Sequence, residues 1–247
     1  MNNYERLEGM VAATFTPMDE NGDVNLSVID KYADWIASTP IKGVFVCGTT
    51  GEFSSLTIDE RNLILEKWLV SARKRFKVIA HVGSNCQRSA MELARHAAQV
   101  GADAIASIAP SFFKPGTVDE LVDFFAPICH SAAGLPFYYY NMPSITGVNL
   151  PVDKFLVEGK KKIPNLVGTK FTHNNLMEMG VCIELEQHRF EVLHGYDEIL
   201  ISGLAMGAVA GVGSTYNYIP NVYQAIFDSM KMNDLETARH NQIKSIR

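Results

Sequence analysis

Short apolar runs alternate with amphipathic segments along the whole chain. The runs at 44–46 and 78–80 are continuously hydrophobic, which is typical of strands buried on both faces of a parallel sheet. The segment 26–38 instead repeats its apolar residues at the spacing of a helix face. Strands that alternate with helices indicate parallel pairing through helical crossovers.

The same alternation continues to the last segments of the chain. Thr57, followed by Glu60 three residues later, predicts a capping box, and Gly101 is placed to end a helix. We expect strands at 9–16, 43–47, 77–82, 103–109, 137–140, 166–171, 190–193 and 208–213. We expect helices at 26–38, 57–74, 88–100, 118–132, 152–158, 175–186, 198–206 and 221–230.

Eight strand–helix units within 247 residues fit a (β/α)8 TIM barrel better than an open sheet. No G-x-G-x-x-G motif follows the first strand, which argues against a dinucleotide-binding fold. The sequence therefore predicts the α/β class, with residues 1–247 forming one barrel domain.

The composition of the chain argues against several classes of protein. A hydrophobic content of 47% with 20% charged residues excludes a disordered chain, and a formal net charge of −5 argues against a nucleic-acid binder. The cluster of Lys160, Lys161 and Lys162 is interpreted as a solvated loop. No apolar run reaches the roughly 18 residues of a membrane helix, and residues 1–8 lack a signal-peptide core. Four cysteines without a C-x-x-C pair favour a reducing compartment, so we expect a soluble, cytoplasmic protein.

Active sites of such barrels lie at the carboxyl ends of the strands. Lys170 comes at the end of an apolar strand, where lysine is uncommon. A lysine held in an apolar mouth can stay uncharged and act as a Schiff-base nucleophile. The alternatives are a side chain that extends to the rim, or one paired with a carboxylate.

Other strand ends carry weaker signals. The turn at 48–51 offers backbone N–H groups and the hydroxyls of Thr49 and Thr50, which suits a carboxylate. Tyr140 could relay protons or belong to the core. Asp197 could bind substrate or cap a helix. The loop at 211–214 could hold a phosphate, but the nearby acidic residues favour a neutral polyol. The histidines show no metal-ligand spacing and are interpreted as structural or surface residues, and no metal is expected.

Four motifs in order resemble the N-acetylneuraminate lyase / dihydrodipicolinate synthase family of pyruvate-dependent class I aldolases. They are Gly48-Thr49-Thr50-Gly51-Glu52, Tyr140-Asn141-Met142-Pro143, Gly168-Thr169-Lys170 and Gly211-Val212-Gly213-Ser214-Thr215. Dihydrodipicolinate synthases carry an arginine shortly after the second motif, and here Ile145 takes that place. The segment Gly195-Tyr196-Asp197-Glu198 is similar to the sugar-binding segment of the sialic acid lyases.

The resemblance implies cleavage of N-acetylneuraminate to pyruvate and N-acetylmannosamine, with no cofactor. Lys170 would form the imine and Tyr140 would relay protons. The substrate carboxylate would bind Thr49 and Thr50. The polyol chain of the substrate would bind Thr172, Gly195, Asp197, Glu198 and Ser214. A homotetramer is also implied.

Two departures from the family pattern stand out. Phe112 and Phe113 occupy the place where many relatives carry a tyrosine that reaches a neighbouring subunit. The helical C-terminal extension of the family is expected to be largely absent. Two alternatives stay open at this point: an aldolase for another 2-keto-3-deoxy sugar acid, and a non-catalytic sugar-acid binder.

Overall fold

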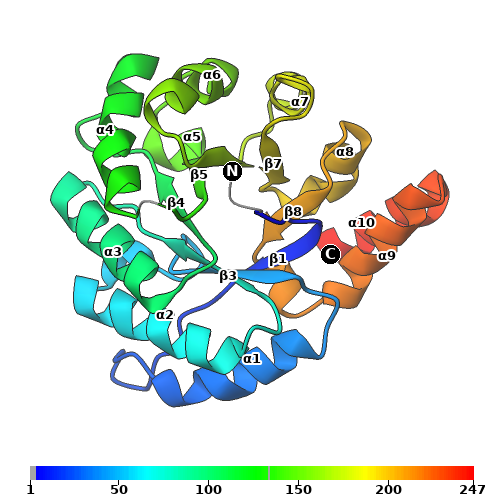
Figure 1. Ribbon diagram of the computed structural model, residues 1–247. Coiled ribbons are helices and arrows are strands. Elements are labelled where there is room, and N and C mark those ends of the chain that lie inside the picture. Colours follow the sequence, from blue (N-terminus) through cyan, green and yellow to red (C-terminus); the bar gives the residue numbers. More distant parts are fainter. Residues whose placement is uncertain (1–3, 133) are drawn as a thin grey trace.

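The computed structural model describes residues 4–132 and 134–247, in which eight parallel strands close into a barrel (Figure 1). Strand β1 pairs with β8 as well as with β2, and Val11 lies opposite Val212 across the closure. The strands are β1 (Gly9–Ala13), β2 (Gly43–Val46), β3 (Lys77–His81), β4 (Ala104–Ile108), β5 (Phe137–Asn141), β6 (Leu166–Phe171), β7 (Glu191–His194) and β8 (Ala210–Gly213). The predicted (β/α)8 barrel is therefore confirmed.

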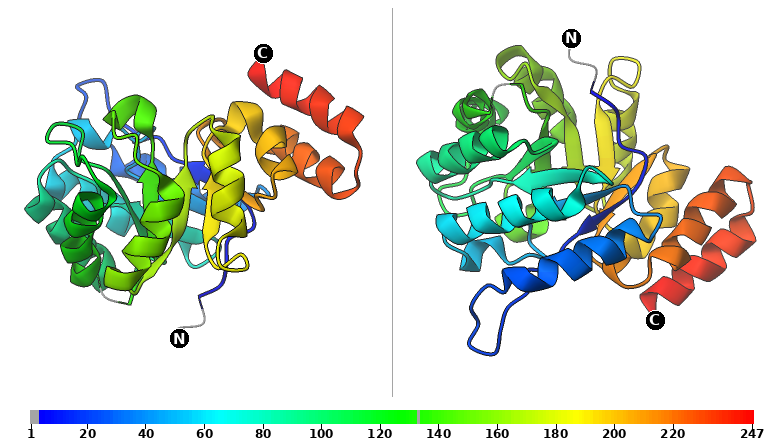
Figure 2. Two further views of the ribbon diagram at one scale, coloured as in Figure 1. Left: turned by 90° about the horizontal axis from the view of Figure 1, so that it is seen from above. Right: turned by 60° about the horizontal axis from the view of Figure 1, so that its bottom comes forward.

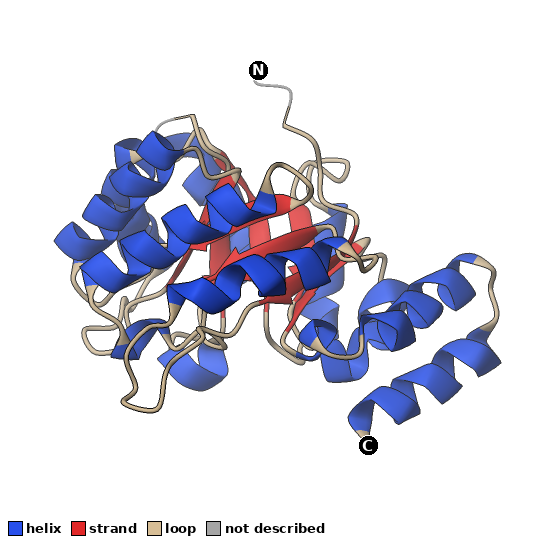
Figure 3. Ribbon diagram, turned by 90° about the horizontal axis from the view of Figure 1, so that it is seen from below, coloured by secondary structure: helices blue, strands red, loops and turns tan. Residues whose placement is uncertain are grey.

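A ring of helices surrounds the strands (Figures 1 and 3). The helices that follow the eight strands in this ring are α1 (Ile29–Ala37), α2 (Ile58–Ala72), α3 (Gln87–Val100), α4 (Val118–Ser131), α6 (Val152–Lys162), α7 (Leu176–Glu184), α8 (Leu200–Ala205) and α9 (Pro220–Lys231). Short 3-10 turns occur at Leu26–Val28, Phe53–Ser55, Asp197–Ile199 and Thr215–Asn217. Within the described residues, each helix falls short of the length and hydropathy needed to span a membrane.

Local signals in the sequence set several helix ends. The Glu60 N–H donates to the Thr57 hydroxyl, and the Glu60 carboxylate accepts from the Thr57 N–H at 2.8 Å, which confirms the capping box at the start of α2. Gly101 ends α3 with a φ of 83°, a left-handed conformation that glycine adopts without a steric penalty.

Three segments differ from the sequence predictions. Helix α5 (Pro143–Thr146) is absent from the predicted helices, and it starts at Pro143 because proline fits the first turn of a helix. The prediction of a loop at the three lysines is wrong, since they form the last turn of α6. Cations are favoured at that end of a helix, and the Lys160 Nζ also donates to the carbonyl of Leu166 at 2.8 Å.

The third difference lies near the C-terminus, where α10 (Leu235–Ile246) follows α9 as a helical hairpin. Figure 2 shows this hairpin projecting from one side of the barrel. Buried Gln242 of α10 reaches back to the barrel, where its Nε2 donates to the Asp197 carbonyl at 3.0 Å and its Oε1 accepts from the Ile201 N–H at 2.9 Å. The hairpin is thereby attached to the loop that follows β7.

The hydrophobic core has two layers, because alternate strand residues face opposite sides of the sheet. One layer lies between the strands and the helices and includes Trp68, Phe125 and Phe155. The other fills the barrel interior and includes Phe45 and Tyr140. Side chains of the interior layer that stand near the carboxyl ends of the strands form the floor of the candidate site.

Candidate active site

Lys170 points into the barrel from the end of β6. Its side chain is only 4% exposed, and its Nζ lies 4.0 Å from the centre of the Tyr140 ring and 4.3 Å from that of Phe45. Across residues 4–132 and 134–247, no carboxylate forms an ion pair with this amine. The lysine therefore neither extends to the rim nor pairs with an acid, and both alternative interpretations of its position are excluded.

Tyr140 connects the lysine to the neighbouring strand ends. It is the register partner of Lys170, and its hydroxyl shares a hydrogen bond of 3.1 Å with Thr49 Oγ1. The same hydroxyl donates to Met142 Sδ at 3.1 Å. A phenol next to an amine and a second hydroxyl can carry a proton between them.

The turn after β2 lets the backbone approach a ligand closely. A Cβ on Gly48 would lie 2.8 Å from the Phe45 ring, and one on Gly51 would lie 3.0 Å from the Thr14 carbonyl oxygen, so both positions favour glycine. In the described part of the chain, the N–H groups of Thr49 and Thr50 donate no backbone hydrogen bond. These two N–H groups and two hydroxyls can serve a carboxylate, an acceptor-only group.

Asp197 forms the centre of a second polar cluster, at the ends of β7 and β8. Its buried carboxylate accepts from the Thr215 N–H at 2.8 Å and from the Thr215 hydroxyl. The Asp197 side chain therefore does not cap the helical turn in which it lies, which was the alternative interpretation. A Cβ on Gly213 would lie 2.7 Å from the Asp197 carboxylate, so glycine makes room for it. Glu198 is the next residue along the chain, and its side chain is exposed. Partial desolvation of its carboxyl, together with the negative charge of Asp197, raises the pKa of that carboxyl.

Thr172 and Gly195 lie in van der Waals contact across neighbouring strand ends. A Cβ on Gly195 would lie 2.0 Å from Thr172 Oγ1, so only glycine fits there. The Thr172 hydroxyl is buried and has no hydrogen-bond partner among the described residues. Half-buried Ser214 follows β8, and its carbonyl accepts from the Asn217 Nδ2 at 2.7 Å.

The structure thus brings the sequence-predicted residues to one end of the barrel, in two groups. Direct contacts join Lys170, Tyr140 and Thr49. Asp197 and Thr172 each contact a glycine of a neighbouring strand end, whereas Thr50, Glu198 and Ser214 are placed there by the strands they follow. Ile145, which takes the place of an arginine, lies in α5 and is exposed.

Sequence reasoning missed two polar residues of this end of the barrel. Asn217 donates from its Nδ2 to the Ala13 carbonyl at 2.7 Å as well as to Ser214, which ties β1 to the loop after β8. His81 is buried at the end of β3 beside the Tyr140 ring, with 5.8 Å between ring centroids. The position of His81 at a strand end is the signal that the sequence carries for this residue. The sequence analysis nevertheless interprets the histidines as structural or surface residues.

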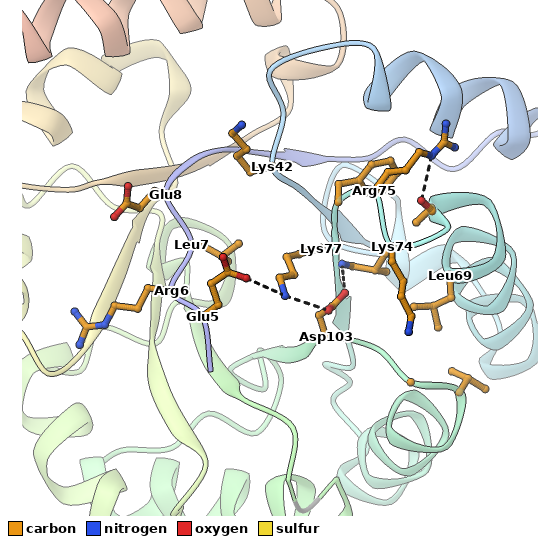
Figure 4. Close-up of a pocket in the computed structure, with 15 residues that line it drawn as sticks. Glu5, Arg6, Leu7, Glu8, Lys42, Leu69, Lys74, Arg75, Lys77 and Asp103 are labelled. Carbon is orange, nitrogen blue, oxygen red and sulfur yellow. Dashed lines mark hydrogen bonds and ion pairs between the residues drawn. The ribbon is translucent and has the colours of Figure 1, made fainter. Parts of the chain in front are cut away.

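A cavity of about 1020 Å³ lies at the other end of the barrel (Figure 4). Its lining includes the starts of β3 and β4, where Lys77 pairs with Asp103 at 3.7 Å and with Glu5 at 3.6 Å. A smaller hollow of about 350 Å³ lies at the carboxyl ends, next to the candidate site. It is lined by Pro143, Ser144, Gly147, Asn149, His173, Asn174 and Tyr196.

The fold and this site define the class of protein. The family model described as the dihydrodipicolinate synthetase family matches residues 6–246, and the chain belongs to that family. It is 44% identical to the N-acetylneuraminate lyase of Gallus gallus over 98% of this chain and 80% of the relative. It is 42% identical to the N-acetylneuraminate lyase of Mus musculus over 97% of this chain and 76% of the relative.

A solved structure adds a comparison in three dimensions. The N-acetylneuraminate lyase of Proteus mirabilis superimposes with a TM-score of 0.96 at 35% sequence identity, covering 98% of this chain and 82% of that one. The chain thus spans about four fifths of this relative, and nearly all of this chain belongs to the shared part.

Proposed function

We propose that this chain is a class I aldolase that cleaves N-acetylneuraminate to pyruvate and N-acetylmannosamine through a Schiff base on Lys170. The observation that carries the proposal is the environment of the amine. Lys170 is buried between two aromatic rings, without an acidic partner in the described residues, at the end of the barrel where such enzymes place their chemistry. An amine at that place can attack the ketone of a bound keto acid.

The chemistry follows from the imine. The Lys170 Nζ attacks the C2 ketone of the open-chain sugar acid, and loss of water leaves a protonated imine. When the C4 hydroxyl gives up its proton, the C3–C4 bond breaks and its electron pair moves into the imine to form an enamine. Protonation at C3 and hydrolysis then release pyruvate and restore the amine. The imine is the electron sink, so the proposed reaction needs no metal or organic cofactor.

Tyr140 is assigned the proton transfers. Its hydroxyl is shared with Thr49, and its ring lies against the Lys170 Nζ, so it borders both the carboxylate end and the reacting carbon. A positioned group of this kind typically contributes a factor of about 100 to 10,000 to the rate.

The remaining predicted residues are assigned to substrate binding. Thr49 and Thr50 would hold the carboxylate with their hydroxyls and N–H groups. Thr172, with its unpaired hydroxyl, and the Gly195 backbone would meet the first polyol hydroxyls. The acceptors for the rest of the chain would be Asp197, Glu198 and Ser214. Hydroxyl groups need acceptors as well as donors, which suits two carboxylates.

The identity of the aldehyde product rests on two observations. The N-acetylneuraminate lyases of Gallus gallus and Mus musculus match almost the whole of this chain, and aliphatic Ile145 offers nothing to a second substrate carboxylate. Steady-state turnover of N-acetylneuraminate and of 2-keto-3-deoxygluconate tests the choice. We expect a higher kcat/KM for N-acetylneuraminate. The reverse order would favour the second aldolase, and turnover of neither would favour a sugar-acid binder.

For assembly and location, we propose a cytoplasmic homo-oligomer, a tetramer by family resemblance. Phe112 and Phe113 are 77% and 86% exposed and pack edge to face at 5.0 Å, on the loop after β4 beside the barrel mouth. Exposed aromatic pairs of this kind are enriched at protein interfaces. All four cysteines are free, which agrees with a reducing compartment. Sedimentation velocity tests the subunit number, and a monomer would contradict it.

A further inference from the structure

His81 forms a hydrogen bond that fixes the turn assigned to the substrate carboxylate. Its Nδ1 lies 2.8 Å from the carbonyl oxygen of Cys47, the residue directly before that turn. A carbonyl oxygen can only accept, so the proton resides on Nδ1 and the imidazole donates. The bond joins the end of β3 to the end of β2.

The accepting peptide needs such support. Cys47 has a φ of 53°, in the left-handed region that residues with a Cβ rarely adopt, and Glu52 on the far side of the turn has a φ of 56°. A left-handed backbone is strained at residues with a Cβ and persists only where the surroundings hold it. The orientation of the Cys47 carbonyl in turn sets the direction of the peptide that leads into Gly48 and Thr49.

The imidazole itself is held from several sides. Its ring packs against Phe53, Phe45 and Tyr140, with centroid separations of 4.6, 5.8 and 5.8 Å. The Arg61 guanidinium donates to the His81 carbonyl at 2.7 Å, which fixes the backbone behind the ring.

The protonation state of His81 agrees with its role as a hydrogen-bond donor to Cys47. Burial, followed by the positive charge of Arg61, lowers the pKa of His81 well below its ordinary value. The ring is therefore neutral, with one N–H, and that N–H is used on Cys47. The opposite nitrogen, Nε2, is buried, has no hydrogen-bond partner within residues 4–132 and 134–247, and lies against Gly83, where a Cβ would be 2.6 Å away.

We propose that His81 is a positioning residue of the carboxylate site, which holds the Cys47 peptide so that Thr49 and Thr50 face the amine of Lys170. The inference rests on the proposed function of that turn. His81 acts through the backbone of a neighbouring strand and through the Tyr140 ring, and it does not itself touch the substrate.

Two nearly isosteric replacements separate the hydrogen bond from the packing. His81→Asn keeps an N–H donor close to the position of Nδ1, whereas His81→Leu has the same shape without a donor. Loss of one buried hydrogen bond of this kind corresponds to about a tenfold change in an equilibrium constant. We therefore expect the KM for N-acetylneuraminate to rise about tenfold more in His81→Leu than in His81→Asn. Equal KM values in two variants of equal thermal stability would overturn the proposal.

A matched control uses the buried histidine at the end of β7. His194 faces α8, where a Cβ on Gly203 would meet its ring, and its Nδ1 lies 3.4 Å from Met179 Sδ, a weak acceptor. Replacing it with Asn or Leu should therefore give no comparable difference in KM between the two variants. A similar KM difference at His194 would mean that the effect at His81 reflects general packing.

A second readout does not depend on turnover. Amide hydrogen exchange at 47–51 should be faster in His81→Leu than in His81→Asn, with β6 and β7 unchanged. If the wild-type protein cleaves no sugar acid but this difference appears, the positioning role stands and the proposed function fails. If turnover is normal and exchange at 47–51 is the same in both variants, the positioning role is wrong.

Discussion

The Nζ of Lys170 lies 4.0 Å from the centre of the Tyr140 ring, and the two residues are register partners on adjacent strands. This pairing places a buried amine beside a phenol whose hydroxyl already contacts Thr49. A shift of the amine toward solvent would break its contact with the Tyr140 ring. A shift of the phenol would break its hydrogen bond with Thr49. The proposed nucleophile and the proposed proton relay are therefore held next to one another by the strand register.

Replacement of the phenol tests the relay. Tyr140→Phe keeps the ring against Lys170 and removes only the hydroxyl. We expect kcat to fall about 100-fold or more while KM changes little, because the loss affects proton transfer rather than ground-state binding. Steady-state kinetics with N-acetylneuraminate measure both parameters, and an effect confined to KM would contradict the assigned role.

The neighbouring tyrosine on the same strand supplies the control. Tyr139 faces the helices, where its ring packs 4.6 Å from that of Phe155. Tyr139→Phe removes a buried hydroxyl from the opposite face of the sheet. Its kcat should stay near that of the wild type.

The attachment of α10 to the site leads to a prediction about stability and substrate affinity. Gln242→Leu leaves the Ile201 N–H and the Asp197 carbonyl without their partners, and unsatisfied buried polar groups of this kind cost about 1–3 kcal/mol. We expect a lower free energy of unfolding in urea and a severalfold higher KM for the sugar acid. Asn241→Leu is the control, because its amide bonds only within α10, to the Thr237 carbonyl at 3.0 Å. Equal KM values in the two variants would contradict the coupling.

A pH-dependent contribution to stability arises at the other end of the barrel. Glu191 accepts hydrogen bonds from the Tyr138 hydroxyl at 2.9 Å and the Leu7 N–H at 3.0 Å, and burial raises the pKa of its carboxyl above 4.5. Above pH 4.5, up to that raised pKa, the folded protein binds more protons than the unfolded chain, so this group lowers stability as the pH rises.

Glu191→Gln removes this contribution because the amide does not titrate. The free energy of unfolding of the variant, minus that of the wild type, should therefore increase between pH 4.5 and pH 7.5. Urea denaturation of both proteins at several pH values measures the difference. A difference for Glu191→Gln that is flat or decreases with pH would show that burial does not dominate.

Much of the barrel follows from local chemistry, and therefore from sequence. Continuous apolar runs mark strands that are buried on both faces, and side chains such as that of Thr57 specify helix starts through contacts three residues away. Helix α10 is not predicted from the sequence because it shows no apolar stripe on the face that packs against the barrel. One of the two buried residues of this face is the polar Gln242. Lys160 was assigned to a loop because its partners, the carbonyls of Pro164 and Leu166, become visible only in the folded chain.

The residues of the candidate site were likewise predictable from the sequence only in part. Strand ends and short motifs were sufficient to nominate Lys170, Tyr140 and Thr49, because a parallel barrel brings every strand end to one face. His81 occupies such an end too, but its role depends on a hydrogen bond across strands to the Cys47 carbonyl, which no spacing in the sequence encodes. Residues that act through another residue's backbone are therefore the ones that sequence reasoning missed.

Covalent trapping of the imine is the most direct test of the account. The protein is incubated with pyruvate, reduced with borohydride, digested and analysed by mass spectrometry, with Lys170→Ala treated in parallel. We expect one reduced pyruvate adduct per chain, on the peptide that carries Lys170, and none in the variant. An unchanged mass, or an adduct on a different lysine, would contradict the assignment of Lys170 as the nucleophile.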